Sequence, residues 1–181
     1  MRQILTSDAL ASGLTHVLKY RGLSSPKWAV IIPIVANSEA HEILLEVRSA
    51  EISQAGDPCF PGGKVEPDES PEAAALRELQ EELGIHAEPT SILGQLPTVN
   101  TFLGSKTNIY VCVISEADAS GLCANTAEVA RVLSVPISYF LENPHESSYT
   151  IDGSTVWGMT AGAIHHLCDV WTQAFGPEVR G

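Results

Sequence analysis

The segment from Gly63 to Ile85, GKVEPDESPEAAALRELQEELGI, limits the structures open to this chain more than any other. Its Ser70-Pro71-Glu72 step is typical of a helix start, because serine caps free amides, proline suits the first helical position and an acid complements the helix dipole. Gly84 is typical of a helix end, where glycine adopts a left-handed conformation at little cost. The segment therefore predicts a helix over 71–83 that follows a glycine turn.

Acidic side chains gather on one side of this expected helix. At about 100° per residue, three carboxylates share a face opposite the leucine face of Leu76, Leu79 and Leu83. Like charges at this spacing destabilise a bare helix, whereas a divalent cation reverses that sign. Oxygen ligands suit Mg²⁺ or Mn²⁺, which also take ligands from a substrate phosphate. The sequence thus predicts a cation site formed by Glu78, Glu81 and Glu82.

The turn before the helix carries two adjacent glycines, Gly62 and Gly63. Glycine lets a backbone approach a ligand closely and adopt positive φ without strain, so a carbonyl of this turn, that of Gly63, is expected to complete the metal site. Arg77 is expected to hold the neighbouring Glu78 carboxylate in one orientation through a bidentate bond. The alternative is a solvated acidic face that binds nothing.

The remaining chain alternates between strand and helix patterns. Apolar spacing predicts a first helix over 8–19, capped by Ser7 or Asp8, and a last helix over 160–175. Pro33 favours a bulge or an edge position in the first strand. The expected strands cover 28–36, 41–48, 87–99, 108–115 and a short run from 133, with a loop over 119–126 and a hairpin around Asp152-Gly153. This order predicts one α/β layered domain over residues 1–181.

Charge narrows the classes of partner. The net charge is −12, which disfavours nucleic-acid binding because phosphate backbones repel such a surface. No apolar run is long enough for a membrane span, and the first residues lack the apolar core of a signal peptide, so a cytoplasmic protein is expected.

The four widely spaced cysteines are expected to be free thiols. The apolar face of helix 160–175 suits either a homodimer contact or the core.

The central segment resembles the Nudix box, G-x5-E-x7-R-E-U-x-E-E-x-G-U with U apolar, at every defined position from Gly63 to Ile85. The resemblance implies an α/β/α sandwich with a mixed sheet, and hydrolysis of a nucleoside diphosphate linked to another moiety with Mg²⁺ or Mn²⁺. It also implies that Glu78 and Glu82 bind metal, that Glu81 is a further ligand or a base, and that Arg77 orients Glu78. Glu69 would support the loop.

A narrower resemblance lies outside the box. Leu44 to Ser49, then Gly56 to Gly63, are similar to the signature L-L-T-x-R-S, an Arg-containing spacer and G-x3-F-P-G-G of coenzyme A pyrophosphatases. Two departures stand out: Glu46 replaces the usual threonine, and the spacer has no arginine. The resemblance implies cleavage of coenzyme A to 4′-phosphopantetheine and adenosine 3′,5′-bisphosphate.

This resemblance places further residues near a substrate. Arg48 and Lys64 are the local cations for a 3′-phosphate, and Phe60 and Gly62 belong to the substrate-binding turn. Glu128 matches the additional acid that Nudix enzymes often supply from a later loop, as base or ligand; the alternative is a solvated loop acid. Two other functions stay open: hydrolysis of ADP-ribose, a sugar nucleotide or a damaged nucleoside triphosphate, and a binding module without turnover.

Overall fold

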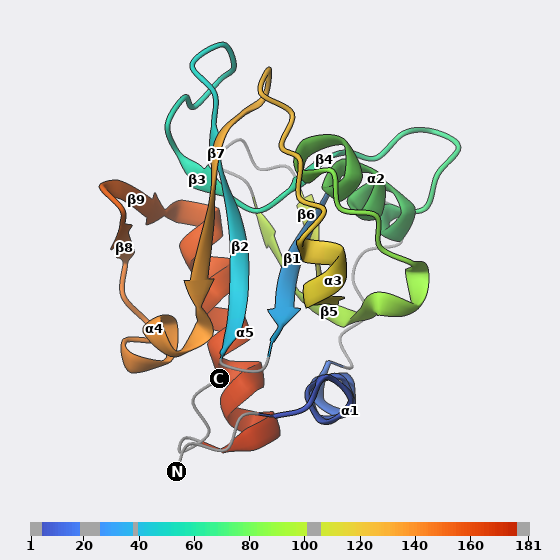
Figure 1. Ribbon diagram of the computed structural model, residues 1–181, viewed down its shortest axis with the longest axis vertical. Coiled ribbons are helices and arrows are strands. Elements are labelled where there is room, and N and C mark those ends of the chain that lie inside the picture. Colours follow the sequence, from blue (N-terminus) through green and yellow to red (C-terminus); the bar gives the residue numbers. More distant parts are fainter. Residues whose placement is uncertain (1–4, 19–25, 38–39, 101–105, 177–181) are drawn as a thin grey trace.

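The computed structural model describes residues 5–18, 26–37, 40–100 and 106–176. Figure 1 shows a twisted sheet with helices on both sides. The helices and strands are α1 (Ser7–Val17), β1 (Trp28–Ala36), β2 (His41–Arg48), β3 (Pro58–Cys59), β4 (Gly62–Lys64), α2 (Pro71–Leu83), η1 (Pro89–Ser91), β5 (Ile92–Asn100), β6 (Lys106–Ser115), α3 (Glu116–Ala119), β7 (Val129–Pro136), α4 (Ile137–Glu142), β8 (Ser148–Ile151), β9 (Ser154–Trp157) and α5 (Gly158–Phe175).

The main sheet of the described chain runs in the order β3-β2-β1-β6-β5, with β4 paired to β1 and β7 paired to β2. The β1–β6 pair is parallel, and the other pairs are antiparallel. The sheet is therefore mixed, as expected. The hairpin β8–β9 forms a separate two-stranded sheet.

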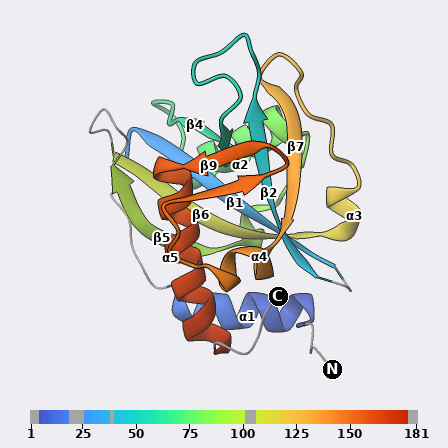
Figure 2. The same ribbon diagram turned by 90° about the vertical axis from the view of Figure 1, so that its left-hand side faces the viewer.

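Alternation along β1 builds one core on each face of the sheet. Ile31 and Ala29 face α2, where they pack with Leu79 and Leu83. Residues of the opposite parity, such as Ile32 and Ile34, face α1 and α5 and pack with Leu10, Leu14, Ile164 and Trp171. Figure 2 shows α1 lying across the foot of the sheet, next to α5. These two layers of helices confirm the predicted α/β/α sandwich.

The apolar face of α5 is used inside the protein. Ile164, Leu167 and Trp171 on this helix are fully buried in the core that the sheet shares with α1. Its apolar spacing is therefore explained by internal packing, and the helix gives no support to a homodimer contact. None of the helices in the described part of the chain is long and apolar enough to cross a membrane.

Pro33 lies in a central strand, not at an edge. On one side β1 pairs with β6 along its whole length, including Pro33 opposite Cys112. On the other side β1 pairs with β4 at 28–30 and with β2 at 34–36. The amide of Ile31 points to this second side, where it donates to the carbonyl of Pro61. By strand alternation the Pro33 nitrogen points the same way, into the interval between the two partners, so no ladder bond is lost.

Several bounds differ from those predicted. The first helix is Ser7–Val17, capped by the Thr6 side chain rather than by Ser7 or Asp8, and residue 19 of the predicted range lies outside the described residues. The 3₁₀ turn Pro89–Ser91 delays the strand expected from residue 87. The first residue of the loop expected over 119–126 is the last residue of α3. The strand expected from residue 133 is β7, which already starts at Val129. The helix expected from residue 160 is α5, which starts at Gly158. Strands 28–36 and 41–48 and the hairpin around Asp152-Gly153 are confirmed.

The caps of α2 are those predicted from its sequence. Ser70 Oγ accepts a hydrogen bond from the Ala73 amide at 3.1 Å, and Pro71 is the first helical residue. Gly84 ends the helix in the left-handed conformation with φ of 70°. A Cβ there would also stand 2.7 Å from the carbonyl oxygen of Cys123, so the position demands glycine on both counts.

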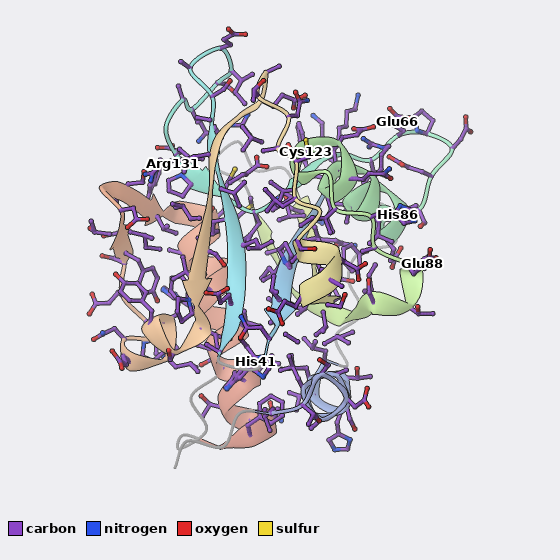
Figure 3. All side chains as sticks on the ribbon, viewed as in Figure 1. His41, Glu66, His86, Glu88, Cys123 and Arg131 are labelled. Atoms are coloured by element: carbon purple, nitrogen blue, oxygen red, sulfur yellow. The ribbon has the colours of Figure 1, made fainter. Side chains whose placement is uncertain are left out.

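The cysteines among the described residues are free thiols, as expected. Cys112 and Cys168 are buried, Cys59 is half-buried and Cys123 is exposed. Figure 3 shows Cys123 beside the end of α2. Its amide donates to the Leu83 carbonyl at 2.9 Å, so the following loop is attached to the helix.

Replacing the cap tests how far local sequence stabilises α2. The Ser70→Ala variant should lose about 1 kcal/mol in free energy of unfolding, since it leaves an amide of the first turn without its acceptor. Urea unfolding monitored by circular dichroism measures the loss. Ser148→Ala, at an exposed position on β8, is the matched control and should change stability by less than about 0.5 kcal/mol. Equal stability of the two variants would contradict the capping role.

Candidate active site

The site forms where the short strand β4 runs against α2. The amide of Gly62 donates to Oε2 of Glu82 at 2.9 Å. A Cβ on Gly62 would lie 2.6 Å from the Ala29 carbonyl oxygen, and one on Gly63 would overlap the carboxylate of Glu78. Neither glycine is among the positive-φ residues, so the expectation of positive φ was wrong. Gly62 must be glycine because β4 lies so close to β1, and Gly63 must be glycine because β4 lies so close to α2.

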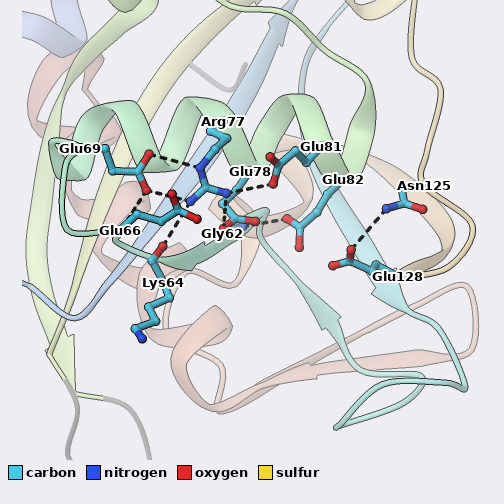
Figure 4. A network of polar contacts seen from close by, with 10 residues as sticks. All are labelled: Gly62, Lys64, Glu66, Glu69, Arg77, Glu78, Glu81, Glu82, Asn125 and Glu128. Atoms are coloured by element: carbon cyan, nitrogen blue, oxygen red, sulfur yellow. Dashed lines mark hydrogen bonds and ion pairs between the residues drawn. The ribbon is translucent and has the colours of Figure 1, made fainter.

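Arg77 is the hub of the carboxylate network drawn in Figure 4. Its Nε and Nη2 bind both oxygens of Glu69, at 3.2 and 2.8 Å. Its Nη1 donates to Glu78 Oε1 and to Glu81 Oε2, each at 2.9 Å. Its Nη2 also donates to the Lys64 carbonyl at 3.2 Å. Arg77 therefore does contact Glu78 as predicted, but its bidentate partner is Glu69.

Glu69 supports the loop before α2. Its Oε1 accepts a hydrogen bond from the Glu66 amide at 3.0 Å, in addition to the bond from Arg77. The hydrogen bond from Arg77 is the main cause that holds the pKa of Glu69 below its usual value. Glu69 thus stays ionised and fixes both the loop and the guanidinium that reaches Glu78.

Glu82 is buried, which corrects the prediction of an acidic face opposite the leucines. Its exposed fraction is 4%. At about 100° per residue, Glu82 lies only about 60° from Leu79 around the helix, at the border of the apolar face. Burial, followed by the charge of Glu46, raises the pKa of Glu82 to about 9, against the stabilising hydrogen bond from Gly62.

Glu46 is a member of the site that sequence reasoning did not include. It lies on β2 opposite Cys59 of the neighbouring strand β3, and it is 1% exposed. Burial raises the pKa of Glu46 to about 7, opposed by the Cys59 thiol and by Arg48. Strand alternation could have revealed its position, because Leu44 and Glu46 share a parity and Leu44 packs in the core beneath α2. The departure from threonine was the only other signal.

Glu128 brings a further carboxylate from the loop before β7. Figure 4 shows it facing the end of α2 that carries Glu82. Its charge raises the pKa of Glu46, Glu78 and Glu82, although burial is the largest cause for each. Asn125 Nδ2 donates to Glu128 Oε1 at 3.3 Å. The sequence-predicted loop acid is therefore close to the helix carboxylates.

Backbone bonds attach this loop to the end of α2. The Asn125 amide donates to the Glu82 carbonyl at 2.9 Å, next to the bond from Cys123 to Leu83. On its other side the loop joins β2, since the Ser49 amide donates to the Glu128 carbonyl at 2.8 Å. The helix, the loop and the end of β2 thus hold their acidic side chains in a common frame.

The four predicted substrate-binding residues fall in different settings. Arg48 Nε donates to the Ser53 carbonyl at 2.8 Å, so this arginine stabilises the loop after β2. Lys64 is exposed, and its side chain points away from the carboxylates in Figure 4. Phe60 is 5% exposed and packs in the core, so its ring does not line an open site. Gly62 alone contacts the carboxylate cluster, through its amide.

The donor set fits a hard divalent cation. It contains only oxygen ligands, a glycine cradle beside Glu78, and a buried carboxylate oxygen, Oε2 of Glu46, to which no N–H or hydroxyl group of the described residues donates. Within the described ranges no three His, Cys, Asp or Glu side chains already form a metal-binding arrangement. Arg77 holds Glu78 and Glu81 in this state, so cation binding requires these side chains to reorient.

A comparison with protein families supports this assignment. The model described as the NUDIX domain matches residues 25–148. The chain belongs to the Nudix family. A Nudix hydrolase is a pyrophosphohydrolase that acts on phosphorus-containing acid anhydrides in small nucleoside diphosphate substrates, and the family generally requires a divalent metal ion.

Curated relatives agree with this membership. The chain is 34% identical over 155 residues to the "Uncharacterized Nudix hydrolase NudL" of Photorhabdus laumondii, covering 77% of this chain and 81% of that protein. It is 33% identical over 126 residues to the "Peroxisomal coenzyme A diphosphatase NUDT7" of Mus musculus. That match covers 68% of this chain but only 52% of the mouse protein.

Solved Nudix structures share the fold at low sequence identity. A MutT/nudix family protein from Enterococcus faecalis has a TM-score of 0.62 at 17% identity, covering 98% of this chain and 79% of that one. The Nudix domain of Shewanella oneidensis NrtR, solved with ADP ribose, has a TM-score of 0.61 at 19% identity, covering 93% of this chain and all of that chain. These two likenesses establish the fold alone.

The Nudix glycine turn offers a test of site geometry. Gly63→Ala should lower kcat for a hydrolysed nucleoside diphosphate by at least about tenfold, because its Cβ displaces Glu78 and a misplacement of about 1 Å can cost about a hundredfold. The matched control is Gly162→Ala on α5, where a Cβ meets no atom within 4 Å. Unchanged kcat in a folded Gly63→Ala protein would contradict the close-approach role.

The buried carboxyls predict a pH dependence for the metal-free Nudix protein. Glu46 and Glu82, with pKa values of about 7 and about 9, bind protons more tightly when folded than when unfolded. Their contribution to the free energy of unfolding is therefore present at low pH and is lost as pH rises through these values. Urea unfolding in EDTA at about pH 5.5 and about pH 8 measures the decline. It should be smaller in Glu82→Gln; an equal decline would remove Glu82 as its source.

Proposed function

We propose that this Nudix hydrolase cleaves the diphosphate of coenzyme A or a derivative, with Mg²⁺ or Mn²⁺, to 4′-phosphopantetheine and adenosine 3′,5′-bisphosphate. The observation that carries the proposal is the segment from Leu44 to Gly63, which resembles the coenzyme A pyrophosphatase signature directly before the Nudix box. The similarity to the mouse protein described as a coenzyme A diphosphatase supports the same substrate class.

The position of this segment fits a role in substrate choice. It forms β2, the loop after it, β3 and β4, and so it adjoins the carboxylate cluster from the sheet side. Glu46 pairs with Cys59 on β3, and the Gly62 amide on β4 reaches Glu82. A residue change between Leu44 and Phe60 therefore alters the wall of the site while the sequence of the box helix stays the same.

The box carboxylates supply the catalytic groups of the proposed reaction. Glu78 and Glu82, with Glu81 as a further ligand or as the base, would hold the cation, which when bound neutralises charge on the diphosphate and lowers the pKa of a water molecule. Arg77 positions Glu78, while Glu81 or Glu128 accepts the proton of the attacking water. The water oxygen forms a new bond to phosphorus, the bridging P–O bond breaks, and the departing phosphate keeps the electron pair.

Arg48 and Lys64 are the candidate cations for the 3′-phosphate of coenzyme A in the part of the chain that the structure describes. Arg48 uses its Nε for the Ser53 carbonyl and is half-buried at the end of β2, whereas Lys64 extends into solvent beside β4. Arginine binds phosphate in a bidentate manner and lysine as a point charge. We assign the 3′-phosphate to this pair. A cytoplasmic location and a homodimer complete the proposal, the latter without support from α5.

A substrate panel tests the proposal directly. In the presence of Mg²⁺ or Mn²⁺, coenzyme A should give 4′-phosphopantetheine and adenosine 3′,5′-bisphosphate with a larger kcat/KM than ADP-ribose, a sugar nucleotide or a nucleoside triphosphate. Mass spectrometry identifies the products. Glu82→Gln should lower kcat by at least about a hundredfold, since it removes a catalytic group. Turnover of ADP-ribose without turnover of coenzyme A would reject the substrate and keep the hydrolase.

A further inference from the structure

Glu46 is a buried acid that the box does not account for. It belongs to β2, a strand of the sheet, and it stands where the resembled signature has threonine. Its side chain lies on the face of the sheet that α2 covers, beside the carboxylate of Glu82. A threonine-sized side chain would not bring a carboxylate to this point, so the substitution adds an anionic group to the site.

The two oxygens of Glu46 have different surroundings. Oε1 accepts a weak hydrogen bond from the Cys59 thiol at 3.4 Å. Oε2 is buried and receives no hydrogen bond from an N–H or hydroxyl donor among the described residues, and a bond with the neighbouring Glu82 carboxyl requires a proton on one of the two acids. Two adjacent buried carboxylates without such a proton are costly, and a cation can take the place of the proton.

The neighbours of Glu46 define what that ligand is. Glu82, 4% exposed, lies beside it, and Glu78 and Glu128 contribute their charges to the same cluster. Cys59 is a poor competitor for a hard cation, because sulfur ligands suit softer metals. Arg48 is the nearby cation, and its Nε is engaged by the loop carbonyl of Ser53. The environment is thus rich in oxygen and favours a hard divalent ion.

We propose that Glu46 is an additional ligand of the divalent cation, which its Oε2 binds together with the carboxylate of Glu82. The inference rests on the proposed metal-dependent function and adds a sheet-borne ligand to those of the box helix. It makes the cation bridge α2 and β2 rather than sit on the helix alone. The ion gains a carboxylate ligand from the sheet, and the buried oxygen of Glu46 gains a cation as its partner.

Metal binding without substrate tests the proposal. Isothermal titration of the apo protein with Mn²⁺ measures the dissociation constant for wild type, Glu46→Gln and Glu46→Thr. Both variants should bind Mn²⁺ at least about tenfold more weakly, the scale on which even supporting residues of metal sites act. The control is Glu42→Gln, which removes the same charge from the same strand, where Glu42 accepts a bond from Ser134 at 3.0 Å. Its affinity should match wild type.

The outcomes distinguish a failure of the Glu46 ligand role from a failure of the proposed metal-dependent hydrolase function. Unchanged Mn²⁺ affinity in both folded Glu46 variants overturns the ligand role, while wild-type binding and turnover keep the function. Wild type that binds no Mn²⁺ overturns both. If the variants do not fold, a Mn²⁺-soaked crystal of wild type decides: an ion at about 2.1 Å from a Glu46 oxygen supports the proposal, and an ion bound only to box residues overturns it.

Discussion

The hydrogen bond from the Gly62 amide to the Glu82 carboxylate is the contact on which the site depends. It joins β4, a short strand paired with the central strand β1, to the box helix, and a Cβ on Gly62 would clash with the backbone of β1. The same approach places Gly63 against Glu78. A helix with three glutamates is by itself a solvated surface; the strand that presses against it makes one of those acids buried and fixes another.

The carboxylates of the site are held in two different ways in the metal-free protein. Arg77 forms ion pairs with Glu69, Glu78 and Glu81, and of these three acids Glu81 alone is largely exposed. Glu46 and Glu82, at the sheet side, have burial as the chief cause of their raised pKa values. The metal-free protein thus holds Glu69, Glu78 and Glu81 by a guanidinium, whereas burial favours the protonated forms of Glu46 and Glu82. A divalent ion bound by these carboxylates would compete with both the guanidinium and the protons.

The local structure of the site could be predicted from the sequence, whereas some of its contacts between distant elements could not. Helix α2 follows from Ser70, Pro71 and Gly84, because caps are encoded within a few residues. The burial of Glu82 depends on which sheet strand lies beside it, which helical spacing alone does not state. The importance of Glu46 depends on the pairing of β2 with β3 and on the packing of α2 above it. Pro33 was expected at a bulge or an edge, and the structure places it in a central strand, where β2 and β4 pair with β1 on either side of it.

The bonds from Cys123 and Asn125 to the last carbonyls of α2 have a consequence for how such a protein can diverge. Inserting one residue into the helix would turn its end by about 100° and move both acceptors away from the loop amides. The loop that carries Glu128 would then lose its register, even though neither its own sequence nor the box acids had changed. The length of the helix and the position of the loop are therefore coupled. Transferring one of them into another protein without the other would separate the acids that they bring together.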